Sequence, residues 1–233
     1  MSHPNTCIEL RALFAAIVVD DRDRVRQLLK EDPALARELT NTPRLETRIP
    51  HWIYAKDTAL HVAAAGYRVE IAKLLLDAGA NPNSALNHRW SRPLHYAADG
   101  YVISELWNEQ NQVAMIRLLL EAGAEIDAQD KNGATPLHRA VRTRCTAAVK
   151  CLLVAGADTT IKNKPGSTPF HLAVQNTGRG GSGADKAKAA QREIIQAFLA
   201  RGVSPKLADA KGKSVLDWAR SEWIRETLEG ACD

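Results

Sequence analysis

Histidine is the side chain best suited to metal binding and proton transfer near neutral pH, and four of the seven histidines recur in one pattern. His61, His95, His138 and His171 each end a version of the tetrapeptide Thr-Pro-Leu-His, which is complete at residues 135–138. Because each histidine holds the same place in its own copy, successive histidines should lie about one repeated unit apart. That separation is too large for a shared metal ion. We therefore expect each ring to bridge its own backbone and the neighbouring unit.

Other patterns that could carry chemistry are weaker. His3, His51 and His88 have no cysteine or carboxylate at ligand spacing. The glycine-rich run 178–183 lacks the GxxxxGK[ST] form of a phosphate loop and follows no predicted strand, so we interpret it as a linker. Neither a GxSxG motif nor a Cys/His dyad can be assigned from spacing. We expect a protein that is not an enzyme and that uses no metal or cofactor.

The composition is that of an ordinary globular protein. Hydrophobic residues make up 45% and charged residues 25% of the 233 residues, which is enough for a sizeable core. The net charge of +4 is a mild basic bias, short of the dense Lys and Arg clusters of a nucleic-acid binder. The four cysteines Cys7, Cys145, Cys151 and Cys232 form no CxxC pair, and no signal peptide or long apolar run is recognisable. We expect reduced cysteines and a cytoplasmic location.

The elements that must position these residues repeat along the chain. The threonine-like positions 58, 92, 135, 168 and 214 are separated by 34, 43, 33 and 46 residues. Glycines that follow apolar helical runs keep a similar rhythm, with intervals of 44, 33 and 46 residues between Gly79, Gly123, Gly156 and Gly202. In each unit, Thr-Pro should begin one short helix, and the glycine should end a second helix in a left-handed conformation. A turn rich in Asp, Asn and Gly follows, as in residues 127–133.

Residues 131–140 and 74–83 carry the pattern most completely, and both closely resemble the ankyrin repeat, with a weaker similarity to bacterial members of that family. The resemblance extends over about residues 8–230. It implies an all-α fold, an α-solenoid of stacked helix-turn-helix repeats with short β-turn fingers and a concave face lined by the first helices. It also implies a single domain over residues 1–233 with about six repeats. Their approximate bounds are 8–39 for an N-terminal cap, 54–87, 88–130, 131–163, 164–209, and 210–230 for a C-terminal cap.

Three insertions interrupt the rhythm, at residues 40–56, 100–112 and 176–190. The first should lengthen a finger, and the other two should lengthen loops between helices. Repeat-specific insertions often mark a binding face, but a longer loop costs little entropy, so surface decoration is the alternative. Trp52 and Tyr54 favour packing or contact for the first insertion.

Aligning the first helices suggests where a partner would bind. The alignment places Val62, Tyr96, Arg139 and Leu172 at one outward position, and Ala65, Asp99, Arg142 and Gln175 at another, one turn on. We expect a monomeric scaffold that binds a protein partner with an acidic patch on this concave face. The predicted contact residues are Trp52, Tyr54, Arg89, Trp90, Tyr96, Lys131, Arg139, Arg142, Lys162, Lys164 and Gln175. A nucleic-acid-binding protein, disfavoured by interspersed acidic residues, and a host-directed effector or regulatory module are the alternatives; no membrane contact is expected.

Overall fold

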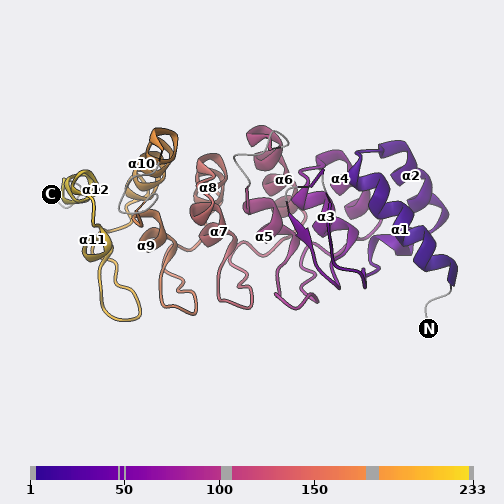
Figure 1. The fold of residues 1–233 in the computed structure, drawn as a ribbon, viewed down its shortest axis with the longest axis horizontal. Coiled ribbons are helices and arrows are strands. Elements are labelled where there is room, and N and C mark those ends of the chain that lie inside the picture. Colours follow the sequence, from indigo (N-terminus) through magenta and orange to yellow (C-terminus); the bar gives the residue numbers. More distant parts are fainter. Residues whose placement is uncertain (1–3, 47, 50, 101–106, 177–183, 231–233) are drawn as a thin grey trace. The chain divides into compact units, whose positions relative to one another are not determined.

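The computed structural model describes residues 4–46, 48–49, 51–100, 107–176 and 184–230, with the side chains of residues 4–7, 44 and 45 outside that description. Its contacts divide the chain into two compact units, Met1–Glu125 and Ile126–Asp233, and each unit has its own packed helices. Figure 1 shows short helices in pairs, with looped fingers extending below them.

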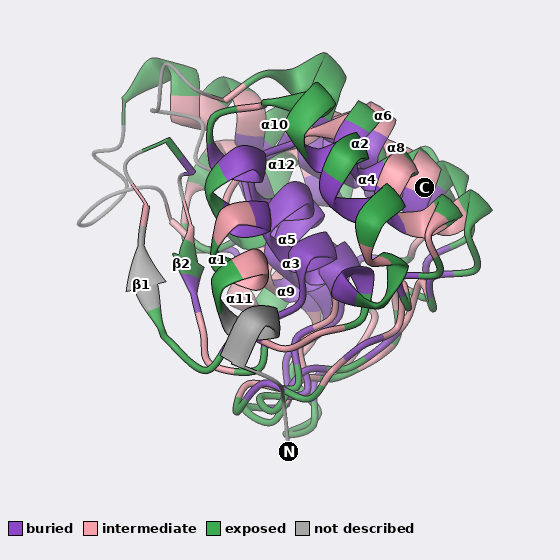
Figure 2. Cartoon of the chain, turned by 90° about the vertical axis from the view of Figure 1, so that its right-hand side faces the viewer, coloured by how far each residue is buried: buried purple, intermediate pink, exposed green. Residues whose placement is uncertain are grey.

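The helices of the first unit form two rows. The inner row is α1 (Pro4–Val18), α3 (Ala59–Ala65) and α5 (Pro93–Ala98), and each of them packs against the next. The outer row is α2 (Arg22–Glu31), α4 (Val69–Asp77) and α6 (Glu109–Glu121), each packed on the inner helix that precedes it. A 3-10 turn (Pro33–Ala36) and an antiparallel hairpin, β1 (Arg44–Leu45) with β2 (Trp52–Ile53), come between α2 and α3 in the sequence. Figure 2 shows α3 and α5 buried almost throughout, because both rows and the fingers cover them.

The second unit repeats this plan. The first helices are α7 (Pro136–Arg142), α9 (Pro169–Ala173) and α11 (Val215–Trp218), and the second helices are α8 (Thr146–Val154), α10 (Asp185–Leu199) and α12 (Glu222–Glu229). Each first helix packs against its own second helix and against the next first helix. The Phe170 and Phe198 rings stack with centroids 4.8 Å apart, which joins α9 to α10. The third place of the tetrapeptide thus supplies core, since Leu137 and Phe170 are both fully buried.

The tetrapeptide and the glycine act at helix ends as expected. Thr135 is the N-cap of α7, and its hydroxyl accepts the His138 N–H. A proline follows the cap, where no N–H partner is lost. At the end of α4, Gly79 has φ +88° and the Ala80 N–H donates to the Leu75 carbonyl, which is the Schellman arrangement.

The predicted fold class, an all-α stack of helix-turn-helix repeats with short fingers, is confirmed. Two loops are shorter than predicted, because α6 begins at Glu109 and α10 begins at Asp185, inside the second and third insertions. Residues 101–106 and 177–183 of these insertions lie outside the described residues, as do the side chains of Cys7 and Cys232. Cys145 is buried and Cys151 is half-buried. Among the described helices, none has both the length and the hydropathy needed to cross a bilayer. The single-domain assignment and its repeat bounds stay predictions.

Candidate binding surface on the fingers

The repeated histidines tie each first helix to the next finger. His138 Nδ1 lies 3.2 Å from the Thr135 nitrogen and accepts its N–H, so the ring proton is on Nε2, which lies 3.0 Å from the Ser167 carbonyl oxygen. His61 and His171 make similar two-sided links. Burial lowers the pKa of these three histidines, which favours the neutral rings that the links need. The predicted bridging role is confirmed for these three histidines, and His95 accepts the Arg92 N–H at the start of its own helix.

The fingers of the second unit are closed by a side-chain oxygen at their first residue. Asp130 Oδ1 accepts the N–H groups of Asn132 at 2.8 Å and Ala134 at 3.0 Å. At the start of the next two fingers, Asn163 Oδ1 accepts the Ser167 N–H, and Asp209 Oδ1 accepts the N–H groups of Lys211 and Lys213. Backbone N–H···O bonds of 2.9 Å join neighbouring fingers to one another. The three fingers of this unit therefore form one hydrogen-bonded ladder.

In α7 and α11, the residue four positions after the N-cap holds the finger that precedes the helix in the sequence. In α7, Arg139 Nη2 donates to Asp130 Oδ2 at 2.7 Å, with the two side chains 2% and 4% exposed. At the end of α11, Trp218 Nε1 donates to Asp209 Oδ2 at 3.1 Å. Burial acts to raise the pKa of Asp130, but the Arg139 guanidinium and two backbone N–H groups outweigh it and hold that pKa below its ordinary value.

This anchoring corrects two predicted contact residues. Tyr96 and Arg139 were expected to face outward, yet they are only 1% and 2% exposed. The Tyr96 hydroxyl donates to the Asp57 carboxylate at 2.8 Å, so it serves the interior of the first unit. Helical spacing places both residues on the side of the helix that faces the fingers. That side is covered, because each side chain donates a hydrogen bond to a buried finger carboxylate, Asp57 or Asp130.

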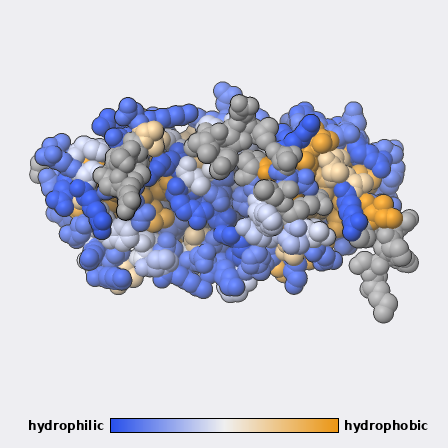
Figure 3. Space-filling model, viewed as in Figure 1, coloured by the Kyte–Doolittle hydropathy of each residue, from blue (hydrophilic) through white to orange (hydrophobic). Residues whose placement is uncertain are grey.

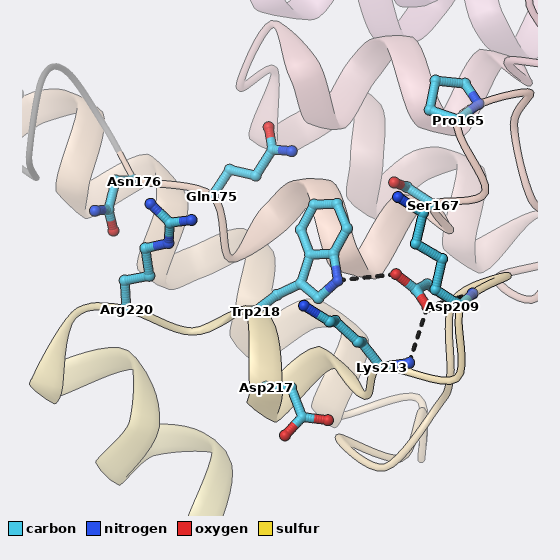
Figure 4. A pocket seen from close by; sticks show the side chains of 10 residues that line it. Pro165, Ser167, Gln175, Asn176, Asp209, Lys213, Asp217, Trp218 and Arg220 are labelled. Carbon is cyan, nitrogen blue, oxygen red and sulfur yellow. Dashed lines mark hydrogen bonds between the residues drawn. The ribbon is translucent and has the colours of Figure 1, made fainter.

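Two open depressions lie along the fingers of the second unit. The first has a volume of about 560 Å³, and its lining includes Arg142 on α7, Leu172 on α9 and Lys164 on a finger. The second, shown in Figure 4, has a volume of about 590 Å³ and lies around Trp218. Pro165 lines both, so the two depressions are neighbours.

The second depression combines an indole with basic and amide side chains. Figure 4 shows the Trp218 indole among the lining residues, with its N–H directed at Asp209. The basic residues of the lining are Lys211, Lys213 and Arg220, and Gln175 adds an amide. An indole beside cations can bind an apolar group and a carboxylate of the same ligand.

Charge is distributed unequally between the two units. Residues 126–233 carry 17 Lys and Arg against 11 Asp and Glu, a net charge of +6, whereas residues 1–125 carry 14 against 16. On the face shown in Figure 3, hydrophilic residues predominate over the fingers of the second unit. The electrostatic preference of this unit is therefore for anionic partners.

Most predicted contact residues of the second unit are accessible. Lys131, Arg142, Lys162, Lys164 and Gln175 are exposed. The structure brings Arg142 and Lys164 together in the first depression and puts Gln175 in the second. Lys162 Nζ lies 3.3 Å from the Asp209 carbonyl oxygen, at the second depression. The lining of neither depression includes Lys131.

The remaining predicted residues belong to the first unit. Trp52 and Trp90 are 43% and 55% exposed. Tyr54 and Arg89 are half-buried against each other, because Arg89 Nη1 donates to the Tyr54 hydroxyl at 2.9 Å and the guanidinium lies over the ring.

Sequence reasoning missed the indole of Trp218 and the basic residues Lys211, Lys213 and Arg220. One signal was available, because Trp218 follows Ser214 by the same four residues that separate Arg139 from Thr135. The two positions are equivalent, and both bind the first residue of a finger.

Comparisons with known proteins agree with this geometry. The family described as ankyrin repeats in three copies matches residues 106–182, and the single ankyrin repeat matches residues 56–87. The E3 ubiquitin-protein ligase XB3 of Oryza sativa subsp. japonica is 35% identical over 85 residues, which are 36% of this chain and 16% of that protein. Alpha-latrotoxin-Lt1a of Latrodectus tredecimguttatus is 36% identical over 86 residues, which are 36% of this chain and 5% of the toxin. The chain thus spans a small part of the length of these relatives.

A solved structure matches nearly the whole chain. An ankyrin repeat domain from Acinetobacter baumannii aligns with a TM-score of 0.67 and 25% identity, over 94% of this chain and 97% of the other. The paired helices, the closed fingers and the family matches therefore agree, and the chain is an ankyrin-repeat protein.

Proposed function

We propose that this protein is a non-enzymatic scaffold whose second unit binds an acidic protein segment along its fingers. Ankyrin repeats are generally protein–protein interaction modules. The observation that carries the proposal is the basic lining of the two neighbouring depressions, which includes Arg142, Lys164, Lys211, Lys213 and Arg220. Cations in a shallow concave surface attract a carboxylate-rich partner and speed its association.

The carboxylates of the same surface are already engaged. Asp130 accepts from Arg139 and from the backbone of its own finger. Asp209 accepts from Trp218 and from its own finger. Asp217 accepts the backbone N–H and the hydroxyl of Ser214 at 2.7 Å each. The basic side chains therefore dominate what this surface offers to a partner.

The surface is also held in place before binding. The histidine links and the finger ladder fix the backbone that carries these side chains. A preformed surface loses little conformational entropy on binding, so more of the contact energy becomes affinity. A monomer in the cytoplasm is part of the same proposal.

Charge reversal tests the proposal. The protein would be used to capture partners from native lysate, which mass spectrometry identifies, and affinity for each purified partner would then be measured. Lys164→Glu with Lys213→Glu should weaken binding about tenfold or more, because attraction becomes repulsion on both depressions. The matched control Lys186→Glu with Arg201→Glu makes the same charge change on exposed residues of the second unit outside both linings, and it should retain binding.

Two results would contradict the proposal. Equal loss in both double variants would mean that net charge matters and the finger surface does not. Tight binding to a generic DNA duplex that falls steeply with salt would favour the nucleic-acid alternative. Arg139 is unsuitable for this test, because Arg139→Glu would bury a second carboxylate beside Asp130.

A further inference from the structure

Trp90 occupies a place that glycine holds in the three fingers of the second unit. It follows the first residue of its finger, Asn87, by three positions, as Gly133, Gly166 and Gly212 follow theirs. The three glycines have φ of +71°, +93° and +76°, and Trp90 has φ +53°. A bulky side chain in this left-handed region is strained, whereas glycine is not.

The turn around Trp90 is otherwise the same as in the glycine fingers. Asn87 Oδ1 accepts the N–H groups of Arg89 and Ser91 at 3.1 Å each, and the Trp90 N–H donates to the Asn87 carbonyl at 3.0 Å. The turn therefore imposes the left-handed conformation and would form equally well with glycine. The indole is 55% exposed, so burial within the chain does not offset the strain. Strain that brings little gain in folding marks a position kept for function.

Further aromatic and apolar residues adjoin this fingertip. His88 and Arg89, the two residues that precede Trp90, both contact the Tyr54 ring. The His88 ring meets it edge-on with centroids 5.0 Å apart, and the Arg89 guanidinium lies over it. Exposure alternates over Trp52, Ile53 and Tyr54, so Trp52 and Tyr54 lie on the same side of the β2 segment. We define the Trp90 surface as Trp52, Tyr54, Leu86, His88, Arg89 and Trp90, in which Leu86 is 62% exposed.

We propose that the Trp90 surface is a second docking site, which takes a protein segment that carries an aromatic or aliphatic side chain next to a carboxylate. Exposed tryptophan, tyrosine and arginine are the side chains that supply most of the binding energy in protein interfaces. The site is separate from the basic depressions of the second unit and requires no acidic stretch.

The charged residues around the Trp90 surface favour a partner segment that carries a carboxylate. Asp57, an acidic residue that contacts Tyr54 and Asn87, is fully buried and accepts from Asn87, Tyr96 and the Tyr54 backbone. Exposed Lys56 directly precedes it and supplies a cation at the base of the finger. The first unit as a whole carries 14 basic and 16 acidic residues, which disfavours a polyanion such as nucleic acid.

The test compares two substitutions that remove the same indole. Trp90→Gly removes both the indole and the strain, whereas Trp90→Ala removes the indole and keeps the left-handed non-glycine residue. Trp90→Gly should therefore melt about 2–4 °C higher than Trp90→Ala. A random peptide library displayed on phage is the binding probe, selected on the wild-type full chain.

Selected peptides should contain Asp or Glu beside Phe, Trp, Leu or Ile, and they should bind both Trp90 variants and Trp52→Ala about tenfold more weakly than wild type. The matched control Val154→Ala, at a valine that is 73% exposed on α8, should bind them like wild type. Failure to select any peptide, selection of Lys- and Arg-rich peptides, or unchanged binding to Trp90→Gly would overturn the proposal. Displacement of the peptides by an oligothymidine would assign the surface to nucleic acid and would overturn it as well. Retained binding of acidic partners to the second unit in these variants would show that the two sites are independent.

Discussion

The buried pair of Asp130 and Arg139 permits a sharp test of how the fingers are held. Asp130→Asn keeps an oxygen for the finger N–H groups but leaves the Arg139 guanidinium buried beside a neutral amide. Arg139→Leu leaves the Asp130 carboxylate buried without that cation. Removing one member of a buried ion pair costs about 3–5 kcal/mol, so each single variant should lose about 3 kcal/mol of unfolding free energy.

The double variant should recover most of this loss. Asp130→Asn with Arg139→Leu recreates the pair of residue types that the next repeat already has, Asn163 at the finger and Leu172 on the helix. A neutral, well-packed replacement of a buried ion pair is often close to neutral in free energy. We expect the double variant within about 1 kcal/mol of wild type, and hence a coupling free energy of about 3 kcal/mol or more.

Urea unfolding followed by circular dichroism at pH 7 measures these free energies, and hydrogen exchange of the Asn132 and Ala134 amides reports on the finger itself. The lowered pKa of Asp130 gives an independent test through the pH dependence of the unfolding free energy. The stabilisation by the ionised Asp130 should be complete above about pH 4 and be lost as the pH falls through the folded-state pKa. The double variant should lack this pH-dependent loss. Additive single effects, with the double variant destabilised by about 6 kcal/mol, would refute the role assigned to the pair.

Three further predictions follow from buried groups. Burial lowers the pKa of His138 and its counterparts, so below about pH 6.5 the unfolded chain binds more protons than the folded chain. The melting temperature should therefore fall between pH 7 and pH 5.5, and His138→Gln should reduce that fall. The same fall in the variant as in wild type would contradict the prediction. Gly166→Ala should lower the melting temperature, because φ is +93° and the added Cβ would lie 2.5 Å from Ala210 Cβ, whereas Gly156→Ala adds a Cβ in open space and should cost less. Gln191→Leu should lower the free energy of unfolding in urea by about 1–3 kcal/mol, because the fully buried amide donates at 2.7–2.8 Å to the carbonyls of Ala173 and Gln175 at the end of α9. An unchanged free energy would contradict the stabilising role of these two hydrogen bonds.

The sequence predicted the helices, their ends and the structural histidines because local rules determine them. Thr135 caps its helix and Gly79 ends one as expected, and a repeated histidine proved to be a repeated link. These features depend on residues within a few positions of each other or on one neighbouring unit, which a repeat pattern reveals directly.

The surface was harder to predict, because burial depends on what covers a helix. Helical spacing put Arg139 on the side that faces the fingers, but only the structure shows that Asp130 lies across it. Trp90 illustrates the opposite case. Its aromatic side chain suggested contact with a partner. The backbone strain that distinguishes it from Gly133 is visible only in the φ angle, which the sequence does not give. The basic character of the second depression likewise arises from a finger and from the segment between α11 and α12, which the repeat pattern describes poorly.

The most direct test of the central claim is a nitrogen-15 NMR titration of the protein with a captured acidic partner segment. The indole N–H of Trp218 is a distinct probe at the second depression, since it donates to Asp209 inside the lining. We expect shifts in this signal and in the backbone amides of Lys164 and Lys213, and none at Lys186 on α10. Shifts confined to the second helices α8, α10 and α12, with the Trp218 signal unchanged at saturation, would contradict binding along the fingers.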